Sequence, residues 1–236
     1  MERAAPVSRR NRPAKPALSL ESIVDAALVI LDADGLEAVS MRRVAQALDT
    51  GPASLYVYVA NRDELLALLL DRVAAEVRLP APDDERPWRE RLVDLALEAI
   101  SVLGRHRRIS LTIFANVPTG PNALSVGEAM VGLLAEAGAG RQAQAWAVDM
   151  LSLYIAAAAT EDSLYRESGP GDIRKNTINS PVRDTFAALP PERFPHFTNL
   201  HSELTYGTSE QRTRWALEAL INGILATPAV AEPPPP

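Results

Sequence analysis

The chain has 236 residues, of which 47% are apolar, and its 30 acidic and 24 basic residues give a formal net charge of −6. It contains no cysteine, which excludes disulfides, thiol catalysis and cysteine-ligated zinc and suits a cytoplasmic protein. No apolar run is long enough for a membrane span, and the start MERAAPVSRRNRP lacks the apolar stretch of a signal peptide, so we expect neither.

Positive charge is concentrated at the N-terminus, although the whole chain is acidic. Residues 1–19 contain a single acid, Glu2, and five basic residues, which are Arg3, Arg9, Arg10, Arg12 and Lys15. A solvated tail without a binding role explains such a cluster about as well as a binding segment does. We assign residues 1–18 as a disordered basic arm. Whether this arm has a binding role depends on what the adjoining domain binds.

Apolar residues recur at helical rather than alternating spacing along the chain, so we expect no strands. The first predicted helix spans residues 20–34, with Ser19 as its N-cap and Gly35 as part of a left-handed stop. A second, short helix is predicted to begin at Ser40 and to bury the apolar side chains that follow Ser40 at helical spacing.

Two further helices come after the tripeptide DTG. The third is predicted over residues 52–59, with Pro52 in its first turn. The fourth begins after Asn61, and Glu64 stands at the position of a capping box. Together with the first two helices they predict a helical domain over residues 19–79.

The stretch RLPAPDDERP, residues 78–87, is the clearest change in composition and marks the domain boundary. A second helical domain is expected over residues 86–228. Its longer predicted helices are 88–103, 105–116, 122–137, 141–166 and 209–226. Residues 167–200 contain five prolines and two glycines and are read as an excursion with one or two short helices, and residues 229–236 as a disordered proline-rich tail.

The third predicted helix has two unlike faces. At 100° per residue, Leu55 and Val59 fall on one side, whereas the remaining side chains turn away from that core. A helix this short persists only when its neighbours hold it, which leaves its outer face free. A helix, a tight turn and a short outward-facing helix form the helix-turn-helix arrangement, whose second helix enters the major groove of DNA.

The side chains of this unit suit contacts with DNA. The hydroxyl groups of Ser54, Tyr56 and Tyr58 can donate to phosphate oxygens, and Tyr56 is long enough to reach a base edge. Arginines near helix N-termini, and the N-termini themselves, can hold further phosphates. The predicted DNA-binding residues are Ser40, Arg42, Arg43, Pro52, Ala53, Ser54, Tyr56, Tyr58, Asn61 and Arg62. Core packing or a solvated surface explains any one of them taken singly, but their clustering favours DNA, and the basic arm would lie along adjacent phosphates or in the minor groove.

Two segments of this unit carry a family resemblance. LDADGLEAVSMRRVAQAL and ASLYVYVANRDELL resemble the DNA-binding domain of the tetracycline-repressor (TetR) family, and the likeness extends over residues 20–77. It implies DNA contacts from Ser40, Arg42, Ser54, Tyr56, Tyr58 and Arg62. The chain departs from the family pattern at Asp49, Tyr58 and Ala60, where glycine, histidine and lysine are usual, and these changes bear on which operator is read.

Two long predicted helices of the second domain carry mixed stripes of small and large residues, as in helical bundles. One stripe contains Ala143, Trp146, Ala147, Met150, Tyr154, Ala157 and Ala158, and the other contains Trp215, Ala216, Ala219, Leu220, Gly223 and Ile224. The resemblance implies that two such helices from each subunit form a four-helix dimer interface. A two-fold dimer is also needed to read a near-palindrome. Packing within the domain's own core is the alternative.

The segments HRRISLTIFANVPTGPNA, ALPPERFPHF and WALEALINGI resemble the C-terminal domain of the tetracycline repressor, which implies a small-molecule inducer inside the bundle. Candidate pocket residues are His106, Phe114, Asn116, Trp146, Met150, Tyr154 and Glu161, which suit an apolar cavity with a few polar anchors. Core packing, capping and surface positions are the alternatives.

A metal site is not expected. Ile113 stands where the tetracycline-binding relative has a metal-binding histidine, although Glu161-Asp162 match its acidic pair, so we expect no tetracycline–magnesium sensor. His196 and His201 lack a third ligand nearby.

The sequence thus predicts an all-α protein, with an N-terminal three-helix helix-turn-helix DNA-binding domain joined to a helical-bundle domain for ligand binding and dimerisation. Its expected function is that of a homodimeric, ligand-responsive transcriptional repressor on a palindromic operator in double-stranded DNA, without cofactor, metal or membrane. A dimeric DNA-binding regulator without an effector is the first alternative. An enzyme is the second, but no catalytic triad, phosphate-binding glycine loop or carboxylate pair supports it.

Overall fold

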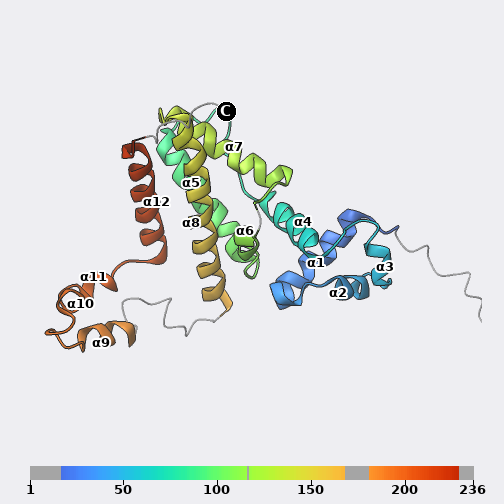
Figure 1. Ribbon diagram of the computed structural model, residues 1–236, viewed down its shortest axis with the longest axis horizontal. Coiled ribbons are helices and arrows are strands. Elements are labelled where there is room, and N and C mark those ends of the chain that lie inside the picture. Colours follow the sequence, from blue (N-terminus) through green and yellow to red (C-terminus); the bar gives the residue numbers. More distant parts are fainter. Residues whose placement is uncertain (1–16, 116, 168–180, 229–236) are drawn as a thin grey trace, which may run out of the picture.

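The computed structural model describes residues 17–115, 117–167 and 181–228, and within these ranges every regular element is helical. Figure 1 shows an N-terminal group of short helices on one side and a group of longer helices on the other. The expected all-α class is confirmed. Residues 1–16 of the basic arm, Asn116 and the tail from residue 229 lie outside the described residues.

The N-terminal group contains α1 (Leu20–Asp34), η2 (Leu36–Ala38), α2 (Met41–Ala47), α3 (Pro52–Leu55) and α4 (Arg62–Ala74). Its helix starts agree with the predicted caps. Ser19 forms a capping box with Ser22, the Ser40 side chain accepts from the Arg43 amide, and Asn61 accepts from the amide of Glu64. Gly35 ends α1 with φ of +86°, a conformation that costs glycine little.

The third helix is shorter than the sequence predicts. It ends at Leu55, and Tyr56–Tyr58 continue as a turn in which the amides of Tyr58 and Val59 both donate to the Leu55 carbonyl, at 2.9 and 3.0 Å. Asn61 is extended, with φ of −161°, and caps α4. Leu55 and Val59 are nevertheless fully buried, as the helical spacing predicts.

The second group contains α5 (Trp88–Arg105), α6 (Leu111–Ala115), α7 (Pro121–Glu136), α8 (Arg141–Glu167) and α12 (Ser209–Ala226). Helix α5 packs along α8 most extensively, with α7 and α12 against them. Gly104 on α5 permits this close approach, because an added Cβ would lie 2.5 Å from an Asp162 carboxylate oxygen. Among the described helices, none combines the length and the apolar character that a membrane span requires.

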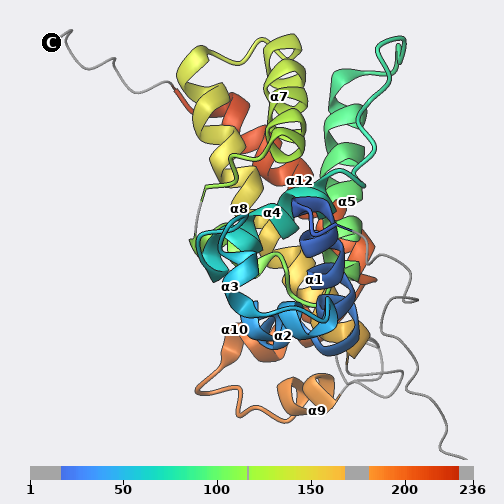
Figure 2. The ribbon, with the colours of Figure 1, turned by 90° about the vertical axis from the view of Figure 1, so that its right-hand side faces the viewer.

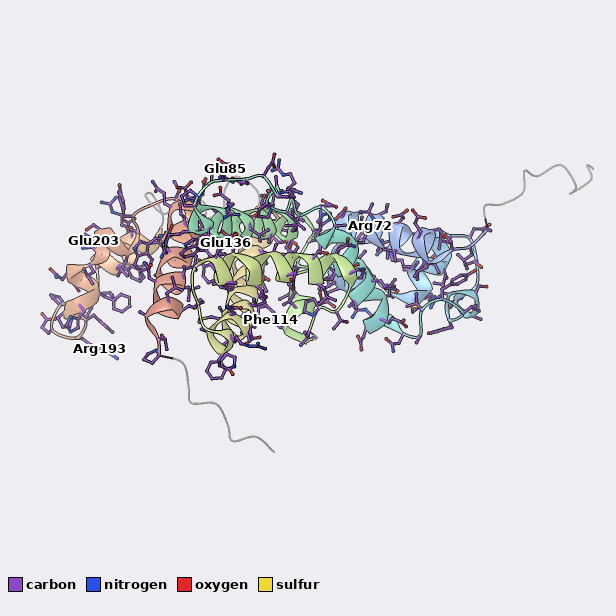
Figure 3. The ribbon with its side chains drawn as sticks, turned by 90° about the horizontal axis from the view of Figure 1, so that it is seen from above. Arg72, Glu85, Phe114, Glu136, Arg193 and Glu203 are labelled. Atoms are coloured by element: carbon purple, nitrogen blue, oxygen red, sulfur yellow. The ribbon has the colours of Figure 1, made fainter. Side chains whose placement is uncertain are left out.

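The described part of the proline-rich excursion contains two short helices, α9 (Pro181–Ala187) and α10 (Pro195–Asn199), which agrees with the one or two expected. A third, α11 (His201–Leu204), follows directly, and the three pack mainly on one another. Seen from above, α9–α11 and the N-terminal group lie at opposite ends of the molecule (Figure 3).

Candidate DNA-binding surface and effector cavity

The surface formed by α3 and the turn after it is exposed and carries both hydroxyl-bearing and apolar side chains. Tyr56 is 55% exposed, Val57 81% and Tyr58 40%, and Ser54 is exposed as well. Leu55 is fully buried and joins this segment to the hydrophobic core to which α1, α2 and α4 also contribute. The helices α2 and α3 lie at one end of the molecule, the end that faces the viewer in Figure 2. The short segment therefore presents Ser54 and Tyr56 outward, as a recognition helix must.

A shallow groove lies between α2 and α3. It is lined by Arg42, Gln46, Asp49, Thr50, Gly51 and Pro52 and has an open volume of about 560 Å³. Asp49 makes the turn with φ of +50°, the left-handed conformation that the usual glycine would adopt more easily. Gln46 and Thr50 were missed by the sequence reasoning, although Gln46 stands one helical turn after Arg42 and so shares its face.

Five of the predicted DNA contacts also bind within the protein. Ser40 and Asn61 cap helices, and three further side chains have partners of their own. Arg43 forms an ion pair with Asp34 at the end of α1. Arg62 donates from Nε to the Val39 carbonyl at 2.8 Å and from Nη2 to the Leu36 carbonyl at 3.1 Å. The Tyr58 hydroxyl donates to the Leu18 carbonyl at 2.8 Å. Arg42 is exposed and has no ion pair among the described residues, so it is the arginine of this surface best placed for an external anion.

The predicted stripes of α8 and α12 lie side by side and line an open apolar groove of about 540 Å³. Trp146 is 55% exposed, Met150 39% and Trp215 73%. Burial raises the pKa of Tyr154 above its ordinary 10.0. A hydrogen bond with Thr213 opposes this rise in pKa, and the negative charge of Glu161 adds to it. Large exposed apolar patches of this kind mark interaction surfaces. Ala157 and Ala158 of the predicted stripe do not line the groove.

A separate cavity of about 370 Å³ lies where α4 meets α5, α7 and α8. Its walls are mainly apolar, with Leu70 from α4, Leu103 from α5, Met130 from α7 and Val148 from α8. Asp149 and Ser152 of α8 supply polar groups. Ile113 also lines this cavity. In the sequence, Ile113 stands at the position of a metal-binding histidine of the tetracycline-binding relative. No group of three metal-binding side chains occurs among the residues that the structure describes.

The structure does not gather the predicted pocket residues in this cavity. Trp146, Met150 and Tyr154 lie in the α8–α12 groove, and Tyr154 and Glu161 also line a groove beside α11. Phe114 on α6, labelled in Figure 3, is 51% exposed. Helical periodicity identified the stripes but could not tell which neighbour each face of the long α8 meets.

His106, another predicted pocket residue, joins the two helical groups instead. It is 8% exposed, with Nδ1 2.8 Å from an Asp32 oxygen of α1 and Nε2 3.3 Å from Glu76, just beyond α4. Asn116 lies outside the described residues. Of the residues proposed as a pocket from the sequence, none that the structure describes lines the cavity where α4 meets α5, α7 and α8.

Comparison with known families and proteins gives consistent matches. Residues 23–69 match the model of bacterial regulatory proteins of the tetR family, and residues 80–227 match the tetracyclin repressor-like C-terminal domain. The HTH-type transcriptional repressor DrrR1 of Streptomyces coeruleorubidus is 33% identical over 92% of this chain and 80% of its own length. The tetracycline repressor protein class E of Escherichia coli is 28% identical over 61% of this chain and 69% of its own length. The crystal structure of ActR from Streptomyces coelicolor in complex with actinorhodin is 36% identical, with a TM-score of 0.77 over 89% of this chain and 98% of that one.

Proposed function

The chain belongs to the TetR family of transcription regulators, and from this premise we propose that it is a homodimeric repressor whose DNA binding is relieved by a small molecule. The dimer binds a near-palindromic operator, and an effector in the α4–α5–α7–α8 cavity favours an arrangement that does not fit the operator. The single observation that carries this proposal is the position of α4. Its N-terminal end holds the helix-turn-helix unit through Arg62, and its C-terminal half, through Leu70 and Ala74, forms a wall of the cavity.

The DNA contact is proposed for the exposed face of α2, α3 and the adjoining turn. Ser54, Tyr56 and Arg42 reach phosphates or bases, and Gln46 joins them from the same groove, since a glutamine side chain can pair with adenine through two hydrogen bonds. One such segment reads too few bases to be specific. A dimer with two half-sites about one helical turn apart supplies the specificity.

The dimer interface is proposed for the α8–α12 groove, since it is continuous, apolar and exposed on a single subunit. Trp146 and Trp215 are the expected anchors, because buried aromatic side chains contribute most to protein interfaces. Both helices are long enough to form a four-helix interface with their symmetry mates.

The effector proposed for the cavity is a largely apolar compound with few polar groups. Such a compound would match the cavity walls, which are mainly apolar and whose polar side chains are Asp149 and Ser152. The ActR complexes with actinorhodin and (S)-DNPA, at 36% and 35% identity, support ligand control in a related protein, and the DrrR1 relative supports repression. We infer a cytoplasmic regulator without enzymatic activity.

The test has two stages. Duplexes are selected from a random library with the purified full-length protein, and the enriched sequence should be a near-palindrome bound by a dimer. Compounds, beginning with actinorhodin, are then screened for thermal stabilisation and for release of that duplex. Failure to select a duplex would refute the DNA-binding proposal, whereas a bound duplex that no stabilising compound releases would favour a regulator without an effector.

A further inference from the structure

We propose that Asp71 of α4 couples the cavity to the DNA-binding unit by capping the first turn of α7, an inference that rests on the proposed function. Asp71 Oδ1 accepts from the amides of Asn122 and Ala123, at 2.9 and 3.0 Å. Its Oδ2 accepts from the Asn122 side-chain amide at 2.8 Å. Both carboxylate oxygens are therefore engaged by one helix end.

This contact replaces a cap that α7 lacks. The helix begins at Pro121 after Gly120, and no side chain of its own segment caps it. The amides of the second and third helical residues are the ones that an N-cap side chain normally satisfies. Here a carboxylate from another group of helices satisfies both, and its negative charge also suits the positive end of the helix dipole.

Gly120 makes the contact possible. A Cβ atom built on Gly120 would lie 2.2 Å from Asp71 Oδ1 and 2.3 Å from its Cγ. Any side chain at position 120 would therefore push the carboxylate out of place. The contact can thus be broken from either helix, by changing Asp71 or by changing Gly120.

The two partners of this contact are also two walls of the cavity. Leu70 and Ala74, which flank Asp71 on α4, line the cavity, and so do Ala123 and Leu124 in the first turns of α7. A ligand that fills 370 Å³ or more presses on both walls at the point where the carboxylate joins them. Movement of the α7 end must then either pull α4 with it or break three hydrogen bonds.

Helix α4 can carry such a movement to the DNA-binding surface. Arg62 and Asp71 are nine residues apart, or roughly 14 Å along a helix. Arg62 binds the carbonyls of Leu36 and Val39, directly before α2. A ligand changes DNA affinity only through contacts that differ between two arrangements of the protein. The contact of Asp71 with α7 is one such contact, and it connects the cavity with the DNA-binding surface.

The first experiment measures hydrogen exchange in the full-length protein, with and without the selected duplex. In the native protein, DNA should slow exchange in peptides covering residues 118–126. Asp71→Asn should raise exchange of the Asn122 and Ala123 amides roughly tenfold, since a bond to a carboxylate is stronger than one to an amide. It should also abolish the effect of DNA there. Native-like exchange in the variant, or no DNA effect at residues 118–126 in the native protein, would overturn the inference.

The second experiment measures the factor by which actinorhodin, as the probe, weakens duplex binding. Asp71→Asn and Gly120→Ala should both bring this factor close to one, while the affinity of the free protein for the probe changes less than about threefold. Asp25→Asn and Gly132→Ala are the matched controls. Asp25 is an exposed carboxylate of α1, 3.8 Å from Arg72, and a Cβ on Gly132 of α7 meets nothing within 4 Å.

The outcomes separate the two proposals. Variants that release DNA as the native protein does would refute the role of Asp71 and leave the proposed function intact. If actinorhodin binds neither the native protein nor its variants, the hydrogen-exchange result decides alone. Absence of any selected duplex would refute the proposed function and this inference with it.

Discussion

Arg62 has two possible roles that one pair of substitutions can separate. The sequence pattern predicts a phosphate contact, whereas the structure shows the guanidinium bound to the carbonyls of Leu36 and Val39. Arg62→Lys keeps the positive charge but cannot reach both carbonyls in the same geometry, because it lacks the planar fork. Arg62→Ala removes both. We expect the structural role to dominate.

The expected magnitude is set by the two hydrogen bonds, at 2.8 and 3.1 Å and only partly buried. Hydrogen bonds from charged donors contribute about 1.5–3 kcal/mol each when buried, so we take about 2 kcal/mol for the pair at this half-exposed site. Arg62→Ala should lower the free energy of unfolding by that amount, and Arg62→Lys by about half of it. For a chain of this size, about 2 kcal/mol corresponds to a fall in melting temperature of roughly 4–8 °C.

The assay combines thermal unfolding with duplex titrations at several salt concentrations. Loss of one phosphate contact reduces the slope of log K against log salt by about 0.9. A structural Arg62 leaves that slope unchanged in both variants while stability falls. If Arg62→Ala melts like the native protein and its salt slope falls by about one, the phosphate contact is the correct role and our reasoning from the carbonyl bonds is wrong.

Four further predictions address the surfaces and one ion pair. Tyr56→Phe should weaken duplex binding roughly fivefold without changing the melting temperature, because the side chain is 55% exposed, and unchanged affinity would remove its hydroxyl from the interface. Trp146→Ala combined with Trp215→Ala should yield a monomer by light scattering at micromolar concentration, whereas a persistent dimer would place the interface elsewhere. Hydrogen bonding from Arg78 holds the pKa of Glu98 below its ordinary 4.5 in the folded protein. The stabilisation from this pair is therefore present above pH 4.5 and is lost as the pH falls through the lowered pKa of the folded state. The difference in melting temperature between the native protein and Glu98→Gln should shrink on acidification, and a difference that grows would contradict this sign. Deleting residues 1–15 should reduce the salt slope by several units, since five basic residues are removed, and an unchanged slope would leave the segment without a role in DNA binding.

Local signals in the sequence predicted most of the fold. Caps at Ser19, Ser40 and Asn61 set the helix starts, and the helical period separated buried Leu55 and Val59 from the exposed side chains between them. These features depend on residues three or four apart, which is the range that a single sequence displays directly.

The remaining features depend on contacts between distant segments. Arg108 adopts φ of +64° before α6, and the predicted helix start at residue 105 is wrong for this reason. Its amide donates to Ser163, 55 residues away, so no local pattern announces the turn. The cavity lining was missed in the same way, because α8 meets different partners on each face.

The acidity of the DNA-binding unit is compatible with its proposed role. Residues 17–77 contain ten acids and four arginines. At least six of these acids are bound within the protein, among them Asp34 by Arg43, Asp32 by His106 and Asp71 by α7. Surface charges more than about 8 Å from a phosphate are screened at physiological salt, so acids engaged at the junction with α5–α7 contribute little at α3. With Arg43, Arg62 and Arg72 also engaged, we expect attraction at the proposed DNA surface to depend on Arg42, the helix N-termini and the basic segment before residue 17.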